Sequence, residues 1–193
     1  YVSGLFMSIN TAKYQDFEKQ GYKKIFGNSK EELYVDHQKY ILSVKSSLPD
    51  HIEAFEVENK IIKTMIKESQ KVISLNCGNG ILEMNLPQEV VAIDNKKENI
   101  EDATYNAKAL GKDNIRFVYG DSLKKMVPFA KKKDYDTVII RGINRISDEL
   151  KDTLRLGKVK TVIYVNSSTS MLAKDLQELS KYYNCLLYTS DAA

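Results

Sequence analysis

Three short apolar runs of this sequence each end in residues that suit a nucleotide ligand. The first run is followed by the glycine loop NCGNG, the second ends in Asp94, and the third is followed by Asp121. Glycines in such a loop permit positive φ and let a ligand approach the backbone. A carboxylate after the second run can accept hydrogen bonds from both ribose hydroxyls, and one after the third can accept from the exocyclic amine of adenine. The residues expected to bind this adenosine-containing ligand are Asn76, Cys77, Gly78, Asn79, Gly80, Asp94 and Asp121.

Two better-known phosphate-binding loops do not fit this stretch. A dinucleotide fingerprint needs a third glycine where Glu83 stands, and a P-loop needs Gly-Lys-Ser or Gly-Lys-Thr, which is absent. Each acidic residue taken alone could also be a helix cap. Because three successive runs agree, we expect a site for an adenosine ligand without a pyrophosphate.

Strands and helices alternate from Lys71 onward, and this alternation must position the loop and the two acids. The apolar runs KVISLNC, EVVAID, NIRFVYG, YDTVIIR and KTVIYVN predict strands. Residues 95–111 predict a helix that Asn95 caps and Gly111 ends. Repeated strand-helix units predict an α/β fold with a doubly wound parallel sheet. The apolar face expected for this helix consists of Ile100, Ala103, Ala107 and Leu110.

The chain before Lys71 reads differently. The stretches YVSGLFMSIN and ELYVDHQKYILSVK predict strands of a small β-rich segment, and residues 51–69 predict a helix that leads into the sheet. We therefore expect a β-rich lead-in over residues 1–48 and an α/β domain over residues 49–184. The apolar side expected for the helix consists of Ile52, Phe55, Ile61, Ile62, Met65 and Ile66.

Composition limits the class of protein. The 193 residues, 42% of them apolar and 28% charged, suit one globular domain, and no apolar run approaches the ~18 residues that span a bilayer. The formal charge of +3 leaves two readings for the lysines at 124–125 and 131–133, a phosphate-binding patch or a solvated surface. Cys77 and Cys185 are too few for a disulfide framework, and His37 and His51 lack partners at metal-ligand spacing. No metal is expected, and the cytoplasm is the expected compartment.

Both ends of the sequence look unusual. Residue 1 is tyrosine rather than methionine, which suggests an internal piece of a longer chain. The final stretch CLLYTSDAA, residues 185–193, resembles the translation of a transposon-end adapter used for sequencing libraries. A strand containing Leu186, Leu187 and Tyr188 is the alternative. On the adapter reading, residues 185–193 are a non-native tail and the domain is incomplete at its C-terminal end.

The motifs together resemble a known family. Residues 72–86 and 90–122 are similar to the first three motifs of the S-adenosylmethionine-dependent RNA uracil-C5 methyltransferases, which make 5-methyluridine in tRNA and 23S rRNA. The stretches GLFMSIN and KKIFGN resemble that family's β-rich lead-in, and VIYVNSSTSMLAKDL its strand-five motif. The resemblance implies a Rossmann-like methyltransferase fold, S-adenosylmethionine as cofactor, and tRNA or rRNA as partner. The residues in register with the strand-five motif are Tyr164, Val165, Leu172, Ala173, Asp175 and Leu176.

The sequence departs from the family where the chemistry occurs. The family adds a cysteine thiolate to uracil C6, and Ser167 stands at the position of that cysteine. A serine hydroxyl without an activating base is a far weaker nucleophile. Arg141 replaces the acidic residue of the strand-four turn; it can contact RNA phosphate but cannot accept a hydrogen bond from uracil. Ser74 and Asn76 also differ from the family, whose glutamine would fall near residues 47–50 and whose base would lie beyond residue 184.

Two functions are consistent with this pattern. The first is an RNA methyltransferase-like protein that binds S-adenosylmethionine, with Ser167 at the catalytic position and Arg141 at the substrate. The alternative is a catalytically silent RNA-binding or assembly module that keeps only the fold. On either reading Cys77 is expected to be a packing residue. Asp175 is expected to orient the helix after the fifth strand or to pair near Lys174, and a catalytic role is the lesser alternative.

Overall fold

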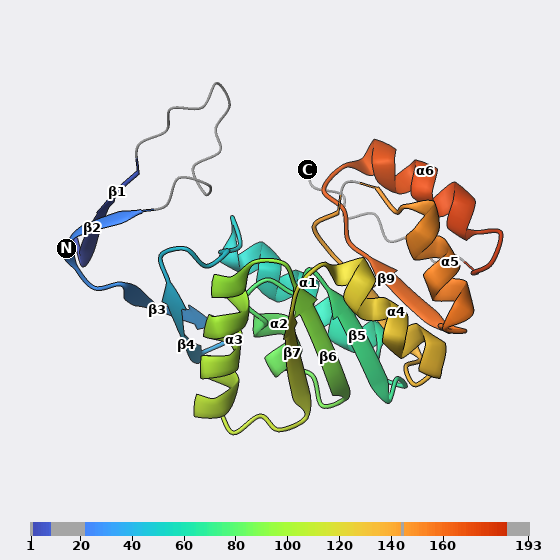
Figure 1. Cartoon of the computed structure of the whole chain (residues 1–193), viewed down its shortest axis with the longest axis horizontal. Coiled ribbons are helices and arrows are strands. Elements are labelled where there is room, and N and C mark those ends of the chain that lie inside the picture. Colours follow the sequence, from blue (N-terminus) through green and yellow to red (C-terminus); the bar gives the residue numbers. More distant parts are fainter. Residues whose placement is uncertain (1, 9–21, 144, 185–193) are drawn as a thin grey trace.

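Five parallel strands form the centre of the molecule (Figure 1). The structure is a computed structural model, and it describes residues 2–8, 22–143 and 145–184. The strands run side by side in the order β7-β6-β5-β8-β9, so β5 lies in the middle. Their bounds are β5 Lys71–Leu75, β6 Glu89–Asp94, β7 Ile115–Tyr119, β8 Thr137–Ile140 and β9 Thr161–Tyr164.

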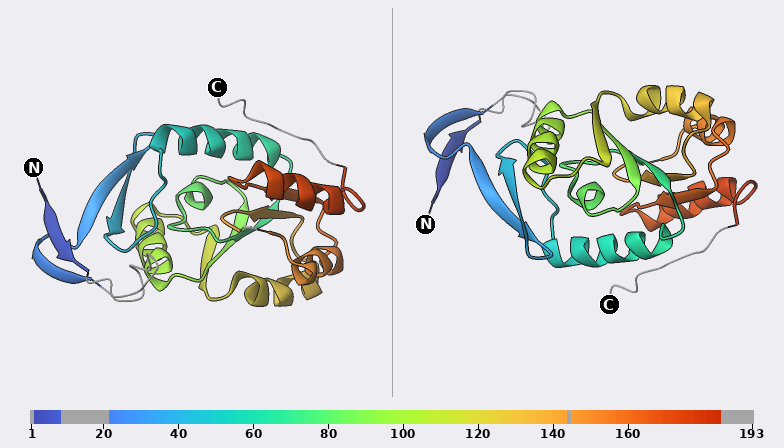
Figure 2. Two further views of the ribbon diagram at one scale, coloured as in Figure 1. Left: turned by 90° about the horizontal axis from the view of Figure 1, so that it is seen from above. Right: turned by 90° about the horizontal axis from the view of Figure 1, so that it is seen from below.

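Alternate residues of each strand point to opposite faces, and each face has its own apolar core. Ile73 and Leu75 pack with side chains of α4, α5 and α6, whereas Val72 packs with Ile62 and Leu82 on the other face. Figure 2 shows α1 and α4 on opposite sides of the sheet. The predicted doubly wound α/β fold is therefore confirmed. The helices are α1 Ile52–Met65, α2 Ile81–Met84, α3 Lys97–Ala109, α4 Ser122–Lys132, α5 Asp148–Leu156 and α6 Thr169–Leu179.

Two antiparallel hairpins precede the sheet and extend from the end of the molecule near α3 (Figure 1). Strand β1 (Gly4–Met7) pairs with β2 (Lys23–Gly27), and β3 (Lys30–Val35) pairs with β4 (Gln38–Ser43). Between β3 and β4, Asp36 and His37 both have positive φ, as a two-residue type I′ turn requires. The predicted β-rich lead-in is confirmed, and its division from the rest at residue 48 stays a prediction.

Polar side chains of α3 fasten the second hairpin to the sheet domain. Asn106 accepts a hydrogen bond from the Ile41 N–H and donates one to the Ile41 carbonyl, both at 2.8 Å. Asp102 accepts from the Ser43 N–H at 2.6 Å and pairs with Lys30 at 3.0 Å. Asp102 and Asn106 are both 2% exposed, so these bonds satisfy the outer edge of β4 away from water.

The predicted start of α3 needs correction. The N-cap of α3 is Lys96 rather than Asn95, because the Asp94 carboxylate accepts from the Lys96 N–H and so caps this end. The predicted end at Gly111 is confirmed, with φ of 64°.

On α1 the predicted apolar side is only partly buried. Phe55, Ile62 and Ile66 are buried, but Ile61 and Met65 are exposed. The helix instead presents Asn59, 1% exposed, on its buried side. A polar residue thus occupies part of the face that periodicity assigned to apolar ones.

Replacing Asn106 with alanine should destabilise the fold by about 1–3 kcal/mol, because a buried backbone N–H and carbonyl of β4 lose their partner. Chemical denaturation followed by circular dichroism measures this change. Thr104→Ala on the exposed side of the same helix is the control and should change stability far less. Equal effects of the two substitutions would contradict the role given to Asn106.

Candidate functional site

The predicted ligand residues meet at the carboxyl edge of the sheet. Since β7, β6 and β5 are neighbours and parallel, Asp121, Asp94 and the loop Asn76–Gly80 follow adjacent strand ends. This edge is where open α/β sheets bind ligands. The structure therefore brings together the residues that the sequence places apart.

The glycine loop depends on its glycines for two different reasons. Gly78 has φ of 60°, and a Cβ added there would meet nothing within 4 Å, so open space lies beside this backbone. Gly80 has φ of 72°, and a Cβ there would lie 2.4 Å from Cε1 of Phe117 on β7. Gly80 therefore allows close packing, whereas Gly78 leaves room for a ligand to approach.

The Asp94 side chain accepts three hydrogen bonds, and the residue is 5% exposed. Its Oδ2 accepts from the Gly78 N–H at 2.9 Å, and its Oδ1 accepts from the Lys96 N–H and the Asn99 amide at 2.8 and 3.1 Å. A carboxylate offers about four lone pairs. These bonds leave one lone pair on Oδ2, enough for one ribose hydroxyl rather than the two expected.

Asn99 was missed in the sequence, and Ser47 was noted there only because it lies near the position of the family's glutamine. Asn99, 2% exposed, accepts from the Ser47 N–H at 2.8 Å and donates to both Ser47 Oγ and Asp94. Asn79 of the glycine loop donates to the Ser47 carbonyl at 2.7 Å. One sequence feature could have indicated Asn99. The polar residues Asn99, Asp102 and Asn106 are spaced so that all three lie on one side of the helix.

Asp121 is exposed and caps α4, because its Oδ1 accepts from the Lys124 N–H at 2.9 Å. The helix-cap role is thus present, and its predicted contact with adenine stays a prediction. Asn76, with φ of 55°, accepts from the Ser122 hydroxyl and donates to the Arg141 carbonyl. Asn76 therefore joins the ends of β5 and β8 to the start of α4.

Cys77 is 3% exposed and packs among apolar residues of α1, α2 and the sheet. Burial, followed by the charges of Glu83 and Asp94, raises the pKa of its thiol well above the ordinary value. A thiol held neutral is a poor nucleophile. The expectation that Cys77 is a packing residue is confirmed.

A buried carboxyl lies beneath the loop. Glu83 is fully buried, and its Oε1 accepts from the Ser74 hydroxyl at 2.6 Å. Burial raises the pKa of Glu83, while the charge of Arg141 and the bond from Ser74 act in the opposite direction. Ser74, one of the departures from the family, therefore has a carboxyl partner in this chain.

Arg141 follows β8 and turns toward α1. Its guanidinium carbon lies 5.2 Å from the centre of the Phe55 ring, and its Nε lies 3.5 Å from Oε1 of Glu58. The side chain is only 17% exposed. Its predicted contact with an RNA phosphate stays a prediction, and most of its surface is taken up by these contacts.

The turn that contains Ser167 is ordered by its neighbours. Asn166 accepts from the Ser168 N–H at 2.8 Å and donates to the Ile143 carbonyl at 3.1 Å. Ser168 caps α6. Ser167 is exposed, and within the described residues its hydroxyl makes no hydrogen bond. No general base therefore contacts Ser167 in the part of the chain that the structure describes.

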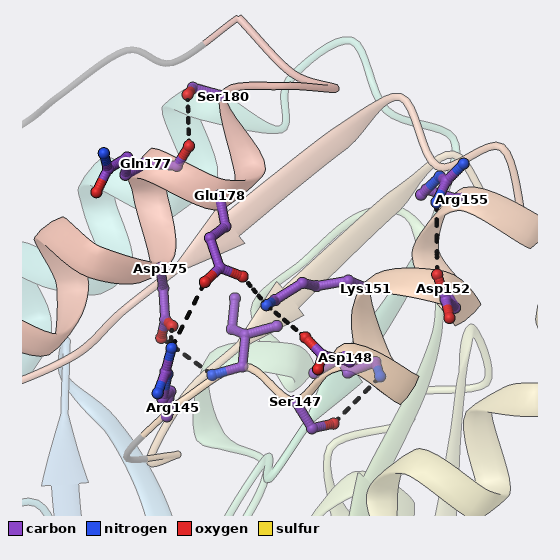
Figure 3. A network of polar contacts seen from close by, with 12 residues as sticks. Arg145, Ser147, Asp148, Lys151, Asp152, Arg155, Asp175, Gln177, Glu178 and Ser180 are labelled. Atoms are coloured by element: carbon purple, nitrogen blue, oxygen red, sulfur yellow. Dashed lines mark hydrogen bonds and ion pairs between the residues drawn. The ribbon is translucent and has the colours of Figure 1, made fainter.

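Asp175 on α6 connects the segment around Ser167 to the loop between β8 and α5. Its Oδ2 accepts from the Ile146 N–H at 3.0 Å and from the Tyr164 hydroxyl at 2.9 Å, and the residue is 0% exposed. Figure 3 shows Asp175 beside Arg145, whose Nε is 3.6 Å from its Oδ1, with Glu178 and Lys151 continuing the network. The prediction that Asp175 orients the helix after the fifth strand is confirmed.

These contacts indicate which ligands and which chemistry the carboxyl edge of the sheet can support. Open backbone at Gly78 and an unfilled acceptor on Asp94 suit a ligand with sugar hydroxyls. Burial raises the pKa of the Cys77 thiol, and among the described residues no side chain forms a hydrogen bond with the Ser167 hydroxyl. Among the described residues, no group of three or more His, Cys, Asp or Glu side chains could hold a metal ion. Nor is any helix of that part of the chain both long and apolar enough to cross a membrane.

Comparison with known proteins identifies the class. A family described as methyltransferase domain matches residues 66–191, so the chain belongs to this family. The resemblance that the sequence motifs indicated is confirmed at this level. The predicted cofactor, S-adenosylmethionine, agrees with membership of this family.

Individual relatives agree with this class. A tRNA/tmRNA (uracil-C(5))-methyltransferase of Nautilia profundicola is 28% identical over 181 residues, which are 84% of this chain and 48% of that protein. An uncharacterised RNA methyltransferase of Halalkalibacterium halodurans is 32% identical over 117 residues, 58% of this chain and 25% of that protein. The chain therefore spans about half or less of the curated relatives' length.

The fold is also seen in a solved structure. The Pyrococcus abyssi tRNA (uracil-54, C5)-methyltransferase, in complex with S-adenosyl-L-homocysteine, superposes with a TM-score of 0.75 at 18% identity. The match covers 91% of this chain and 44% of that one. At this identity the similarity concerns the fold.

Replacing Glu83 with glutamine should make stability less dependent on pH. Burial raises the pKa of Glu83 in the folded chain. Its contribution to folding stability is therefore full below the unfolded pKa of about 4.3 and is lost as pH rises through the folded pKa. Glutamine keeps the acceptor for Ser74 and does not titrate. Denaturation at pH 5 and pH 8 measures the difference, with the exposed Glu89→Gln as control. An unchanged pH profile would contradict the raised pKa.

Proposed function

We propose that this chain is the S-adenosylmethionine-binding part of an RNA methyltransferase of the uracil-C5 type. The observation that carries the proposal is the bond from the Gly78 N–H to Asp94 beside open space. This bond fixes the loop and the carboxylate relative to each other before a ligand arrives. A preformed site of this kind reduces the ordering cost of binding.

Each residue of the edge has a defined part in this proposal. The remaining lone pair of Asp94 Oδ2 accepts from a ribose hydroxyl, and Gly78 lets the ligand lie against the loop. Asp121, whose Oδ1 already caps α4, accepts from the adenine amine with its other oxygen. Asn76, Cys77, Asn79 and Gly80 hold the shape of the loop. The bound cofactor would supply an electrophilic methyl group.

RNA is the proposed substrate because of the relatives. The protein from N. profundicola is named for tRNA and tmRNA, and that from P. abyssi for uracil 54 of tRNA. Uracil C5 is the atom named for both. The sequence resemblance at the glycine loop and at the strand-five motif supports the same substrate class here.

The Ser167 turn favours a second candidate, a catalytically silent RNA-binding or assembly module that keeps only the fold. The family route needs a thiolate, and this chain has an exposed serine with no base in contact among the described residues. Losing a covalent nucleophile commonly costs several powers of ten in rate. A module that keeps only the fold does not need the cofactor site, so binding of the cofactor distinguishes the two candidates.

Replacing Asp94 with asparagine should weaken binding of S-adenosylhomocysteine by about tenfold or more, since a bond to a charged acceptor is lost. Isothermal titration calorimetry on the full chain measures this affinity. Asp113→Asn, at an exposed carboxylate near the opposite edge of the sheet, is the control and should leave binding unchanged. Absence of binding by the unmodified chain, or equal binding by Asp94→Asn, would reject the proposed site.

The product of the reaction distinguishes the two candidates. The chain is incubated with unmodified tRNA or rRNA transcripts and S-adenosylmethionine, and the nucleosides are measured by mass spectrometry. Without an activated nucleophile we expect no 5-methyluridine above background. Formation of 5-methyluridine that Asp94→Asn abolishes would contradict the silent module and establish uracil methylation.

A further inference from the structure

Exposed lysines gather at the amino edge of the sheet, where β8 and β9 begin, on the side away from the glycine loop. Some of them end α4, and the others lie in the connection from α5 to β9. We call this set the amino-edge patch. Its members are Lys131, Lys132, Lys133, Lys158 and Lys160.

A hollow of about 360 Å³ separates the two segments that carry the patch, and Lys133, Lys158 and Lys160 line it. The segments lie side by side because α5 ends in glycine. A Cβ added at Gly157 would lie 3.3 Å from Cα and Cβ of Ala130 on α4, closer than ordinary packing allows. Figure 1 shows the end of α4 beside the start of β9. The fold itself therefore brings these lysines together.

The positive charge of the patch is not balanced by its neighbours. Two acids line the same hollow, and each already has a partner. A carboxylate oxygen of Asp134 lies 3.8 Å from Nζ of Lys71, and Oδ2 of Asp136 accepts from the Gln70 N–H at 3.2 Å. Within the described residues, no lysine of the patch makes an ion pair or a side-chain hydrogen bond.

Stabilisation of a helix end explains only part of the patch. The carbonyl end of a helix carries a partial negative charge, which favours Lys131 and Lys132 in the last turn of α4. Lys160 instead directly precedes β9, and its N–H donates to the Asp136 carbonyl at 2.9 Å. Clustered like charges repel one another and destabilise the folded chain. An anionic partner would remove this cost.

The spread of the lysines favours a chain of phosphates over a single small anion. A small anion needs donors gathered around one point, whereas these lysines extend from the last turn of α4 to the start of β9. A lysine ammonium is a point charge on a flexible stem, so it can contact successive phosphates without a fixed geometry. Such contacts are typical of a nucleic-acid backbone.

We propose that the amino-edge patch binds the phosphate backbone of RNA. This inference rests on the RNA substrate of the proposed function and adds a contact surface remote from the cofactor. Helix α4 has 11 residues and spans about 16 Å at 1.5 Å per residue. About five stacked nucleotides, at roughly 3.4 Å each, cover this length. RNA bound at the carboxyl edge therefore reaches the patch along α4, which carries Lys124 and Lys125 in its first turn.

The test measures binding of a labelled, unmodified tRNA transcript to the full chain by fluorescence anisotropy over a series of salt concentrations. Each phosphate contact contributes about 0.7–0.9 to the slope of log affinity against log salt. A triple variant, Lys133→Gln with Lys158→Gln and Lys160→Gln, should lower this slope by about two to three. Its affinity at about 0.1 M salt should fall at least tenfold. An unrelated RNA hairpin of the same length should lose the same factor, because phosphate contacts carry no sequence information.

The control is a second triple variant with the same change in net charge, Lys67→Gln with Lys108→Gln and Lys112→Gln. These lysines are also exposed, and they lie on or directly after α1 and α3, which pack on the opposite face of the sheet. The control should keep the slope and the affinity of the unmodified chain.

Thermal unfolding of each variant shows whether the fold is retained. If the triple variant of the patch unfolds, the double variant Lys131→Gln with Lys132→Gln keeps the test available, since both side chains are exposed at the end of α4. It should lower the slope by about one to two.

The outcomes separate this inference from the proposed function. Binding of S-adenosylhomocysteine, measured by calorimetry, should be the same in the patch variant and the unmodified chain. Equal slopes for the patch and control variants, or a loss confined to one of the two RNAs, would overturn the patch and leave the RNA substrate and the site at Asp94 intact. Failure of the unmodified chain to bind RNA would reject the proposed substrate, and the patch with it.

A membrane surface is the other polyanion that a lysine patch could meet. Vesicles that contain phosphatidylserine provide the comparison. If the patch variant loses binding to these vesicles while its affinity for RNA is unchanged, the assignment to RNA is overturned.

Discussion

The rest of the site depends on the hydrogen bonds that the buried Asp94 carboxylate accepts. It accepts hydrogen bonds from the glycine loop, from the start of α3 and from Asn99, and so joins β5, β6 and α3 at one point. Asn99 in turn holds Ser47, which follows the second hairpin. A charged acceptor with several N–H donors is stable inside a protein because the donors replace the lost water. The hairpin, the helix and the loop are therefore fixed together before any ligand binds.

The two ends of the carboxyl edge of the sheet differ in the side chains that they present. At β5 to β7 the loop, Asp94 and Asp121 form a surface suited to an adenosine ligand. At β9, Asp175 receives bonds from Ile146 and Tyr164, and the hydroxyl of Ser167 has no hydrogen-bond partner among the described residues.

Periodicity predicted the elements well where one pattern dominates. The strands from Lys71 onward and the helix face with Ala103 and Ala107 were predictable because apolar residues repeat there with a single period. The errors occurred where a tertiary contact replaces a local rule. Asn95 was a reasonable cap, but Asp94 already bonds the next N–H; Ile61 and Met65 are exposed because α1 turns Asn59 inward.

The sequence by itself determined the fold class, the glycine loop and the acids at successive strand ends, because strand pattern and turn chemistry are local properties. The order of the strands was decided only by the tertiary structure, as was the contact of Ser47 with Asn99. The same holds for Arg141, whose neighbours Phe55 and Glu58 lie more than eighty positions away. Burial and charge at such a site come from residues that are distant along the chain, and only packing of α1 against the sheet brings them together.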